Sequence, residues 1–252
     1  MAVIFGINAV VEALKAGGRS FDYIAIMAGR RDARAQLIHE AARDAGVAVR
    51  QVSRDQLARL ANTQSHQGVV AITSEKQYSE LDDIVEAKRG EHNFLLVLDG
   101  VEDPHNLGAI IRTADAAGAD GVVIPERRAA HVTGTVAKAS AGASEYLPIA
   151  RVNNINRTLE ELKEKNIWTI GLDERADKSY DEIDYDIDFA LILGAEGGGL
   201  HEQVRRKCDF LISIPMLGQV PSLNVSVAAA VVMYEAVRQR RHPVRKSKSK
   251  KA

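Results

Sequence analysis

Short, wholly apolar segments alternate with segments of helical periodicity in the second part of the chain, and this alternation constrains the fold most. The apolar segments predict strands at residues 94–98, 121–124, 167–171, 189–193 and 210–214. Helices are predicted at residues 107–117, 131–140, 154–165, 201–207 and 224–238. A strand that is apolar on both faces must be covered on both faces, which is typical of a parallel sheet between helices. The predicted fold class is therefore α/β.

The first 74 residues predict a second, smaller α/β unit. Helical periodicity covers residues 6–16, 33–45 and 55–61, and strand patterns cover residues 23–27, 47–52 and 68–73. Residues 75–93 are charged and mostly polar, which predicts a linker with room for a short helix. The expected organisation is a domain of residues 1–74, a linker of residues 75–93, a larger domain of residues 94–239 and a basic, disordered tail of residues 240–252.

The net charge of -1 conceals an uneven distribution of charged residues along the chain. Residues 1–74 contain 9 Lys and Arg against 6 Asp and Glu, whereas residues 93–237 contain 13 against 22. Residues 238–252 contain 8 basic and no acidic residues. A polyanion such as nucleic acid would therefore meet the first unit and the tail more readily than the central body.

The single cysteine, Cys208, excludes an internal disulfide and any metal site that needs several cysteines. The first 18 residues are apolar but contain Glu12 and Lys15 and lack a basic beginning, so they do not resemble a signal peptide. The longest apolar run, residues 225–234, is too short to span a bilayer. We expect a cytoplasmic protein that needs no metal.

One predicted helix, residues 107–117, carries an arginine among small and apolar residues. Asn106 is a good N-cap, and Pro104 prevents a helix from entering earlier. At about 100° per residue, Arg112 and Gly108 lie opposite the apolar face. Such a face suits close approach by another group, or packing on a second surface with Arg112 paired to an acid. This segment alone leaves both interpretations open.

Two further segments could carry chemistry. Residues 193–200 form a glycine-rich loop between a strand and a helix, at the edge where open α/β sheets bind ligands. The loop lacks the Walker A and dinucleotide-binding patterns, and Glu196 would repel a pyrophosphate, so the loop favours a neutral or cationic ligand or is a plain turn.

Ser222 or Asn224 begins the last helix, either as a simple cap or as part of an anion site. That helix is apolar on nearly all sides, which predicts burial in the core or in a subunit interface.

Taken together, three segments resemble the three motifs of the SpoU branch of the SPOUT methyltransferases: residues 106–108 with 112–113, residues 194–197, and residues 222–226. Members of this family transfer a methyl group from S-adenosylmethionine to ribose 2'-hydroxyls of RNA. Residues 6–14 and 66–70 are similar to the N-terminal extension of members that methylate guanosine in 23S ribosomal RNA. The resemblance implies an L30e-like fold for this extension, a deep trefoil knot in the larger domain, and a homodimer.

The resemblance also implies catalytic roles for individual residues. Arg112 falls on the catalytic arginine of the family. The supporting polar residues fall on Asn106, Glu196, Ser222 and Asn224.

Two binding sites are expected as well. S-adenosylmethionine is expected at Gly194, Ile214, Leu223, Met216 and Gly197, which match the cofactor contacts of the family or lie beside them. RNA is expected to meet the first unit around Arg30, Arg31 and Arg34. These three arginines could equally form a solvated helix face.

Alternative functions remain open at this stage. The same chemistry could act on tRNA, although residues 66–68 favour the ribosomal substrate. A non-catalytic RNA-binding or ribosome-assembly protein is disfavoured because Arg112, Glu196 and Asn224 are all present. A nicotinamide oxidoreductase is disfavoured because no glycine fingerprint follows the first strand of the larger domain.

Overall fold

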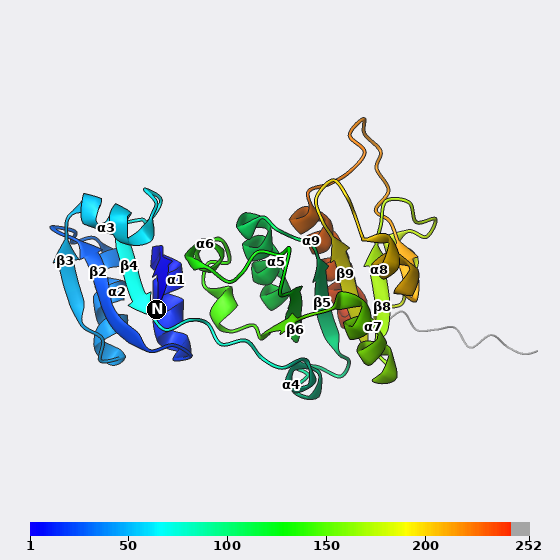
Figure 1. Cartoon of the computed structure of the whole chain (residues 1–252), viewed down its shortest axis with the longest axis horizontal. Helices are drawn as coiled ribbons and strands as arrows, with labels where there is room; N and C mark the ends of the chain where they lie inside the picture. Colours follow the sequence, from blue (N-terminus) through cyan, green and yellow to red (C-terminus); the bar gives the residue numbers. More distant parts are fainter. Residues whose placement is uncertain (243–252) are drawn as a thin grey trace, which may run out of the picture.

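The structure is a computed structural model that describes residues 1–242. Two sheets lie side by side along the long axis of the molecule, and residues 81–86 form a short helix in the segment that connects them (Figure 1). No helix in the described part of the chain is both long and apolar enough to cross a membrane.

The larger sheet has six parallel strands in the order β10-β8-β9-β5-β6-β7. Its strands are β5 (Phe94–Asp99), β6 (Gly121–Pro125), β7 (Ile149–Val152), β8 (Trp168–Leu172), β9 (Phe189–Gly194) and β10 (Phe210–Ile212). The predicted α/β class with a parallel sheet is confirmed. Strand β7 was not predicted, because four residues that include the exposed Arg151 do not form an apolar run.

Helices cover both faces of this sheet (Figure 1). They are α4 (Leu81–Glu86), α5 (Pro104–Ala116), α6 (Gly134–Ala139), α7 (Ile155–Glu164), α8 (Glu202–Lys207) and α9 (Val225–Arg241). Leu96 and Leu98 of β5 belong to the cluster that contains α5 and α9, whereas Leu95 and Val97 belong to the cluster that contains α4, α7 and α8. The alternation follows from the period of two along a strand, and it explains why β5 is apolar throughout.

The strand order places a topological switch between β5 and β9. From β5 the chain adds β6 and β7 on one side, and it later adds β9, β8 and β10 on the other side. The loops that leave β5 and β9 therefore diverge at the carboxyl edge, which is where open sheets of this kind bind ligands. The trefoil knot that the resemblance implies stays a prediction.

Helix α9 runs farther than predicted, to Arg241. Arg240, which the prediction placed in the tail, donates from Nη2 to the backbone oxygens of Asn93 and Ile187 at 3.1 and 3.0 Å. Its guanidinium also lies over the rings of Phe94 and Phe189. Its half-buried position therefore ties α9 to the amino end of the sheet, and residues 243–252 of the predicted tail lie outside the described residues.

The smaller sheet is mixed, with the order β1-β4-β2-β3. Its strands are β1 (Ala2–Phe5), β2 (Phe21–Met27), β3 (Val49–Val52) and β4 (Val69–Thr73), and its helices are α1 (Ile7–Ala16), α2 (Ala33–Asp44) and α3 (Arg54–Ala61). Strand β4 is antiparallel to β1 and β2, and β2 is parallel to β3. Strand β1 was not predicted, but the remaining predicted elements of this unit are present with shifts of one or two residues at their ends.

The two sheets are joined by a buried ion pair as well as by the chain. Arg19, between α1 and β2, donates from Nε and Nη2 to the two carboxylate oxygens of Glu145 at 2.8 and 3.0 Å. Glu145 lies in the short helix η1 (Ala143–Glu145), and both side chains are almost completely buried. Gly134 at the start of α6 approaches the backbone of Val3 so closely that a Cβ would lie 2.4 Å from its oxygen. The smaller unit is thus packed against one end of the larger one.

Candidate active site

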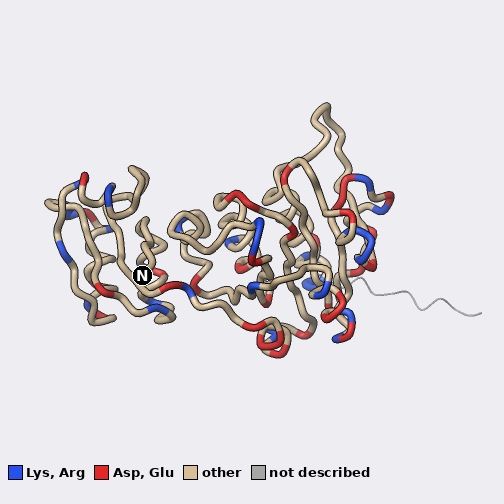
Figure 2. Tube along the Cα trace, viewed as in Figure 1, with Lys and Arg blue, Asp and Glu red and all other residues tan. Residues whose placement is uncertain are grey.

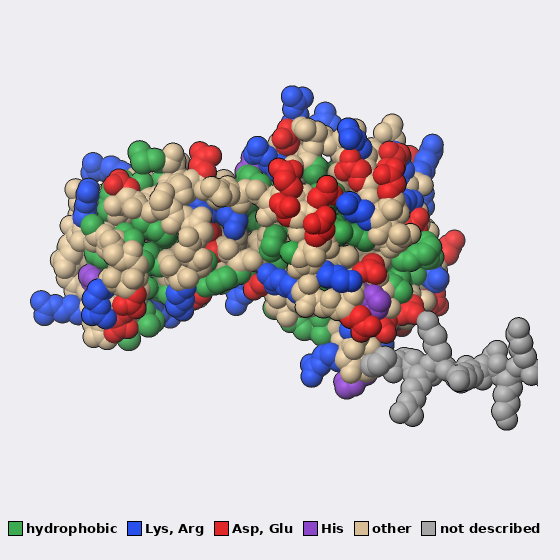
Figure 3. All heavy atoms as spheres, turned by 90° about the horizontal axis from the view of Figure 1, so that it is seen from below, with side chains coloured by type: hydrophobic (Ala, Val, Ile, Leu, Met, Phe, Trp, Pro, Cys, Tyr) green, Lys and Arg blue, Asp and Glu red, His purple; other side chains and the backbone are tan. Residues whose placement is uncertain are grey.

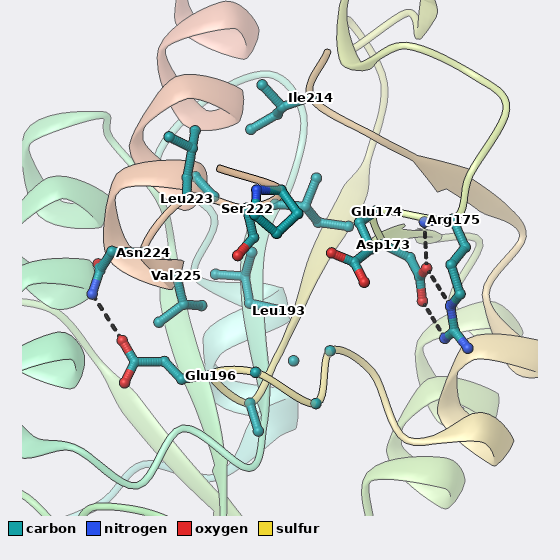
Figure 4. Close-up of a pocket in the computed structure, with 18 of the residues that line it drawn as sticks. Asp173, Glu174, Arg175, Leu193, Glu196, Ile214, Ser222, Leu223, Asn224 and Val225 are labelled. Carbon is teal, nitrogen blue, oxygen red and sulfur yellow. Dashed lines mark hydrogen bonds and ion pairs between the residues drawn. The ribbon is translucent and has the colours of Figure 1, made fainter. Parts of the chain in front are cut away.

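Three segments far apart in the sequence meet at the carboxyl edge of the larger sheet. Asn106 in the first turn of α5 donates from Nδ2 to Oε1 of Glu196, in the loop after β9, at 2.6 Å. Asn224 at the start of α9 donates from Nδ2 to the same oxygen at 2.8 Å (Figure 4) and to Oδ1 of Asn106 at 3.0 Å. One polar network therefore contains a residue from each of the three sequence motifs.

The prediction that Asn106 caps α5 is wrong. Asp103 is the N-cap, and its Oδ1 accepts from the backbone nitrogen of His105 at 2.9 Å. Pro104 is the first helical residue, a position that proline favours because the nitrogen there needs no hydrogen-bond partner. The helix begins three residues earlier than predicted, and the buried Asn106 amide is free to bond across the sheet edge.

Asn224 caps its helix and also joins the polar network. Its Oδ1 caps α9 by accepting from the backbone nitrogen of Ser226 at 2.9 Å and from the Ser226 hydroxyl at 2.6 Å. Its Nδ2 is left for Glu196 and Asn106. Ser222 forms no cap and instead lines a cavity beside the network.

The cavity has a volume of about 650 Å³ and lies between the ends of β8 and β9 and the segment that leads from β10 to α9 (Figure 4). The five residues predicted to bind the cofactor all line it: Gly194, Gly197, Ile214, Met216 and Leu223. Glu196, Ser222 and Asn224 line it too, so two of the three residues of the polar network face this cavity. Its volume falls within the range of roughly 300–1,000 Å³ that is typical of small-molecule sites.

The glycine loop borders this cavity with backbone rather than with side chains. A Cβ on Gly194 would lie 2.1 Å from the carbonyl carbon of Gly199, so only glycine fits there. Ala195 and Gly199 exchange backbone hydrogen bonds at 3.0 Å, which closes the loop tightly. Gly197 and Gly199 have φ angles of 72° and 63°, in the left-handed region that favours glycine. The loop's shape thus requires glycine at positions 194, 197 and 199.

Sequence reasoning missed the charged residues that follow β8. Asp173, Glu174 and Arg175 line the cavity (Figure 4), and Arg175 donates from Nε and Nη2 to the Asp173 carboxylate at 2.9 and 2.8 Å. These hydrogen bonds hold the pKa of Asp173 below its usual value. The sequence could have indicated them as candidate site residues, because they follow a predicted strand at the same carboxyl edge as the glycine loop.

Arg112 is not part of this network. Its side chain is exposed on α5, forms no hydrogen bond or ion pair within residues 1–242, and does not line the cavity. Glu196 bonds to Asn106 and Asn224 rather than to Arg112. The other interpretation, in which Arg112 pairs with an acid of its own chain, is not what the described residues show either.

The three arginines predicted to contact RNA differ in their surroundings. Arg30 forms an ion pair with Asp32 at 3.0 Å and donates to the backbone oxygen of Gln67, which gives it a role within the fold. Arg31 and Arg34 are exposed and have no ion-pair partner in the described part of the chain.

Acidic positions gather on α4, away from the smaller sheet (Figure 2). Lys and Arg side chains lie at the outer end of the smaller unit (Figure 3).

Among residues 1–242 no group of three or more His, Cys, Asp or Glu side chains is arranged to hold a metal ion. Cys208 is largely buried against the α8 side of the sheet, and burial raises its pKa to about 12. Its thiol is therefore neutral at physiological pH and unsuited to act as a nucleophile.

Comparison with known proteins gives consistent matches over nearly the whole described chain. Residues 93–234 match the model of the SpoU rRNA Methylase family, and residues 3–79 match the model for RNA 2'-O ribose methyltransferase substrate binding. The chain is 47% identical to the putative TrmH family tRNA/rRNA methyltransferase YacO of Bacillus subtilis, over 94% of this chain and 95% of that protein. It is 44% identical to the 23S rRNA (guanosine-2'-O-)-methyltransferase RlmB of Bordetella pertussis, over 94% and 97% of the two chains.

Solved structures agree. The SpoU methyltransferase AviRb from Streptomyces viridochromogenes, in complex with AdoMet, matches with a TM-score of 0.78 and 28% identity, over 94% of this chain and 90% of that one. The AdoMet-bound rRNA methyltransferase from Sinorhizobium meliloti matches with a TM-score of 0.74 and 26% identity, over 96% and 88% of the two chains.

Proposed function

The chain belongs to the SpoU rRNA methylase family, and from this premise we propose that it transfers a methyl group from S-adenosylmethionine to a ribose 2'-hydroxyl of RNA. The observation that carries the proposal is the cavity of about 650 Å³ that is lined by Glu196 and Asn224, both of which bond to Asn106 in one polar network. Each of the three family motifs supplies one of these residues, and each of the five predicted cofactor residues faces the same space.

The residues present fit this cofactor. The backbone of the glycine loop can approach a ligand closely, while Ile214, Met216 and Leu223 would offer apolar surface to its adenine ring and methylene groups. Glu174 and Glu196 supply negative charge beside a ligand that carries a sulfonium and an ammonium group. When bound, S-adenosylmethionine supplies an electrophilic methyl group. The protein must then align the ribose oxygen with it, and orientation of this kind can contribute roughly 7–11 kcal/mol.

The 2'-hydroxyl must also lose its proton. Arginine ordinarily has a pKa above about 12, so lowering it by about five units to make a general base would cost about 7 kcal/mol. We propose instead that Arg112 holds the RNA phosphate next to the target ribose and stabilises the developing alkoxide, while the proton leaves to phosphate or water. Its exposed guanidinium has no partner in residues 1–242, and its planar fork suits a bidentate phosphate contact.

The test is to replace Arg112 by lysine and by alanine, with Arg157→Ala on the opposite face of the sheet as a control for a lost surface arginine. A purely electrostatic role predicts partial activity and a shifted pH profile for Arg112→Lys, with normal S-adenosylmethionine binding. Complete inactivity of Arg112→Lys, combined with normal binding of RNA and cofactor, would contradict the purely electrostatic role.

We further propose a homodimer. Leu217, Val220, Val227 and Tyr234 are large apolar side chains that are about half exposed or more, and they extend from the segment before α9 along that helix. Large exposed apolar side chains of this kind are typical of a subunit interface. A second copy would cover it and could bring its Arg112 to the network of this chain. Light scattering that gave a monomer at working concentration would contradict the dimer.

The substrate we propose is a guanosine in 23S ribosomal RNA, acted on in the cytoplasm. Support comes from the Bordetella pertussis relative and from the match of residues 3–79 to a substrate-binding model. We assign RNA binding to residues 1–74, with Arg31 and Arg34 as exposed contacts, residues 75–93 as the linker, and methyl transfer to residues 94–239.

Mapping 2'-O-methyl groups in RNA from cells that lack this protein tests the substrate, because a site lost from tRNA alone would favour the tRNA alternative. Calorimetry with S-adenosylmethionine tests the non-catalytic alternative, which predicts no binding.

A further inference from the structure

A second cavity, of about 360 Å³, adjoins the first one across Glu196. The two cavities share Ala195 and Glu196 in their linings, and Asn106 of the polar network also faces the second cavity. The second cavity is otherwise lined by the segment that leads from β5 into α5, by His201 and by Arg128 after β6. A molecule in the second cavity would therefore meet a molecule in the first one at the polar network.

Most charged side chains that line the second cavity already have partners. The Asp103 carboxylate caps α5, and Oε1 of Glu196 accepts from two amides. His201 lies with Nδ1 2.9 Å from Oδ1 of Asp99. Within residues 1–242, Glu102 and Arg128 are the charged lining residues without a hydrogen bond or ion pair, and both are exposed. The cavity thus offers one free carboxylate and one free guanidinium that do not neutralise each other.

Arg128 is held in an unusual backbone conformation. Its φ angle is 56°, in the left-handed region that residues other than glycine rarely adopt. Such a conformation at a cavity rim is a reason to look for a function of the side chain. The conformation directs attention to Arg128 rather than to its neighbour Arg127, which does not line the cavity.

We propose that this second cavity binds the base of the target nucleotide and that Glu102 and Arg128 read that base as guanine. The inference rests on the proposed function, because it assumes that RNA is methylated at the polar network. The carboxylates in the lining would repel an RNA phosphate, so a base rather than the backbone enters the cavity. With the base there, its ribose lies at the boundary of the two cavities, beside Asn106 and Glu196.

The chemistry of the two free groups matches guanine. A carboxylate accepts hydrogen bonds with two oxygens, and guanine alone among the four bases presents adjacent N1–H and N2–H₂ donors. Guanine also presents the acceptors O6 and N7, to which arginine donates in a bidentate manner. Adenine and cytosine each place an acceptor next to their amino group, and uracil has a single N–H. Glu102 would therefore accept from N1–H and N2–H₂, and Arg128 would donate to O6 and N7.

The first experiment identifies the product. Wild-type protein is incubated with S-adenosylmethionine and an unmodified 23S ribosomal RNA transcript, and the nucleosides are analysed by mass spectrometry. The methylated position is then rebuilt in short RNAs that carry guanosine, inosine or 7-deazaguanosine at that position. Inosine lacks the N2 amino group, and 7-deazaguanosine lacks the N7 acceptor.

We expect the wild type to prefer guanosine over inosine by about 10- to 100-fold in kcat/KM, the size of one hydrogen bond to a charged group. Glu102→Gln should lose a similar factor on guanosine and should no longer distinguish inosine. Arg128→Ala should have the same kcat/KM on guanosine and on 7-deazaguanosine. Alanine has a Cβ as arginine does, so this variant keeps the strained backbone conformation and tests the side chain alone. Both variants should bind S-adenosylmethionine normally, and the exposed-residue controls Glu91→Gln and Arg127→Ala should behave as the wild type does.

The outcomes separate this inference from the proposed function. A wild type that methylates no RNA would overturn the proposed function itself. Methylation of a nucleoside other than guanosine, or a Glu102→Gln variant that still discriminates against inosine as the wild type does, would overturn the base-reading inference and leave methyl transfer standing.

Discussion

Replacing either member of the buried pair of Arg19 and Glu145 should destabilise the protein strongly. The losses in the free energy of unfolding from the two replacements should not be additive. Both side chains are almost completely buried, with two hydrogen bonds of 2.8 and 3.0 Å between them. Removing one partner leaves an uncompensated buried charge, which costs about 3–5 kcal/mol. Lys76 lies beside the pair, with Nζ 3.3 Å from the backbone oxygen of Glu145, and burial lowers its pKa. Glu145→Leu leaves the two cations Arg19 and Lys76 without a carboxylate, whereas after Arg19→Met the carboxylate still has Lys76 beside it. We therefore expect Glu145→Leu to lower the free energy of unfolding more than Arg19→Met does.

Differential scanning calorimetry provides the measurement. At about 2–4 °C per kcal/mol for a chain of this size, each single variant should lower the Tm by about 6–20 °C. The double variant Arg19→Met/Glu145→Leu removes both charges and should be more stable than Glu145→Leu alone. Lys15→Ala, which breaks an exposed pair with Glu12, is the control and should cost no more than about 1 kcal/mol. A double variant whose loss equals the sum of the two single losses would refute the reasoning, because the cost would not come from an unpaired charge.

Three further predictions concern the site and its surroundings. Gly194→Ala places a Cβ 2.1 Å from the backbone across the loop, so S-adenosylmethionine binding measured by calorimetry should weaken by about tenfold or more, whereas Gly198→Ala, with nothing within 4 Å, should bind normally. Because burial raises the pKa of Cys208 to about 12, iodoacetamide at pH 8 should alkylate it only as the protein unfolds; rapid labelling of the native protein would contradict this. Hydrogen bonds from Arg175 lower the pKa of Asp173, so the ionised carboxylate stabilises the fold above its unfolded pKa of about 3.9, and this contribution is lost as the pH falls through the lower native value. Asp173→Asn should therefore reduce the free energy of unfolding in urea at pH 7 and by a smaller amount near pH 3, and a deficit that is the same at both pH values would count against it.

The sequence was a good guide to elements whose pattern is local. Strands such as β5 and β9 are wholly apolar, and the helices between them have clear periodicity, so their existence and order could be predicted. Strand β7 escaped because a short edge strand buries too little to leave an apolar run. The start of α5 was misplaced because Asp103 and Asn106 are both good caps, and Pro104 is compatible with a helix that begins at either.

The candidate site shows the same division. The residues of the three motifs could be identified by their resemblance to a family, and the glycine loop and the helix starts could be placed at the carboxyl edge from their position after strands. Nothing local indicated that Asn106 bonds to Glu196, 90 residues away, or that Asn224 bonds to both. The sequence also could not indicate that Glu102 and Arg128 line the same cavity without an ion-pair partner in the described chain. Whether a charged side chain has a partner depends on how the other charged side chains are placed in the folded structure.

The sequence by itself determined most of the strands and helices, where their apolar faces lie, and which residues match a methyltransferase family. These properties depend on side-chain periodicity and on turn and cap preferences within a few residues of each position. Only the tertiary structure decided that β9 pairs with β5, that Asn106 serves the polar network instead of capping its helix, and that Arg112 is left exposed and unpartnered in the described chain. The physical reason is that pairing of strands and burial of both sheet faces are settled by the whole chain at once, and the positions of polar groups at the sheet edge follow from that choice.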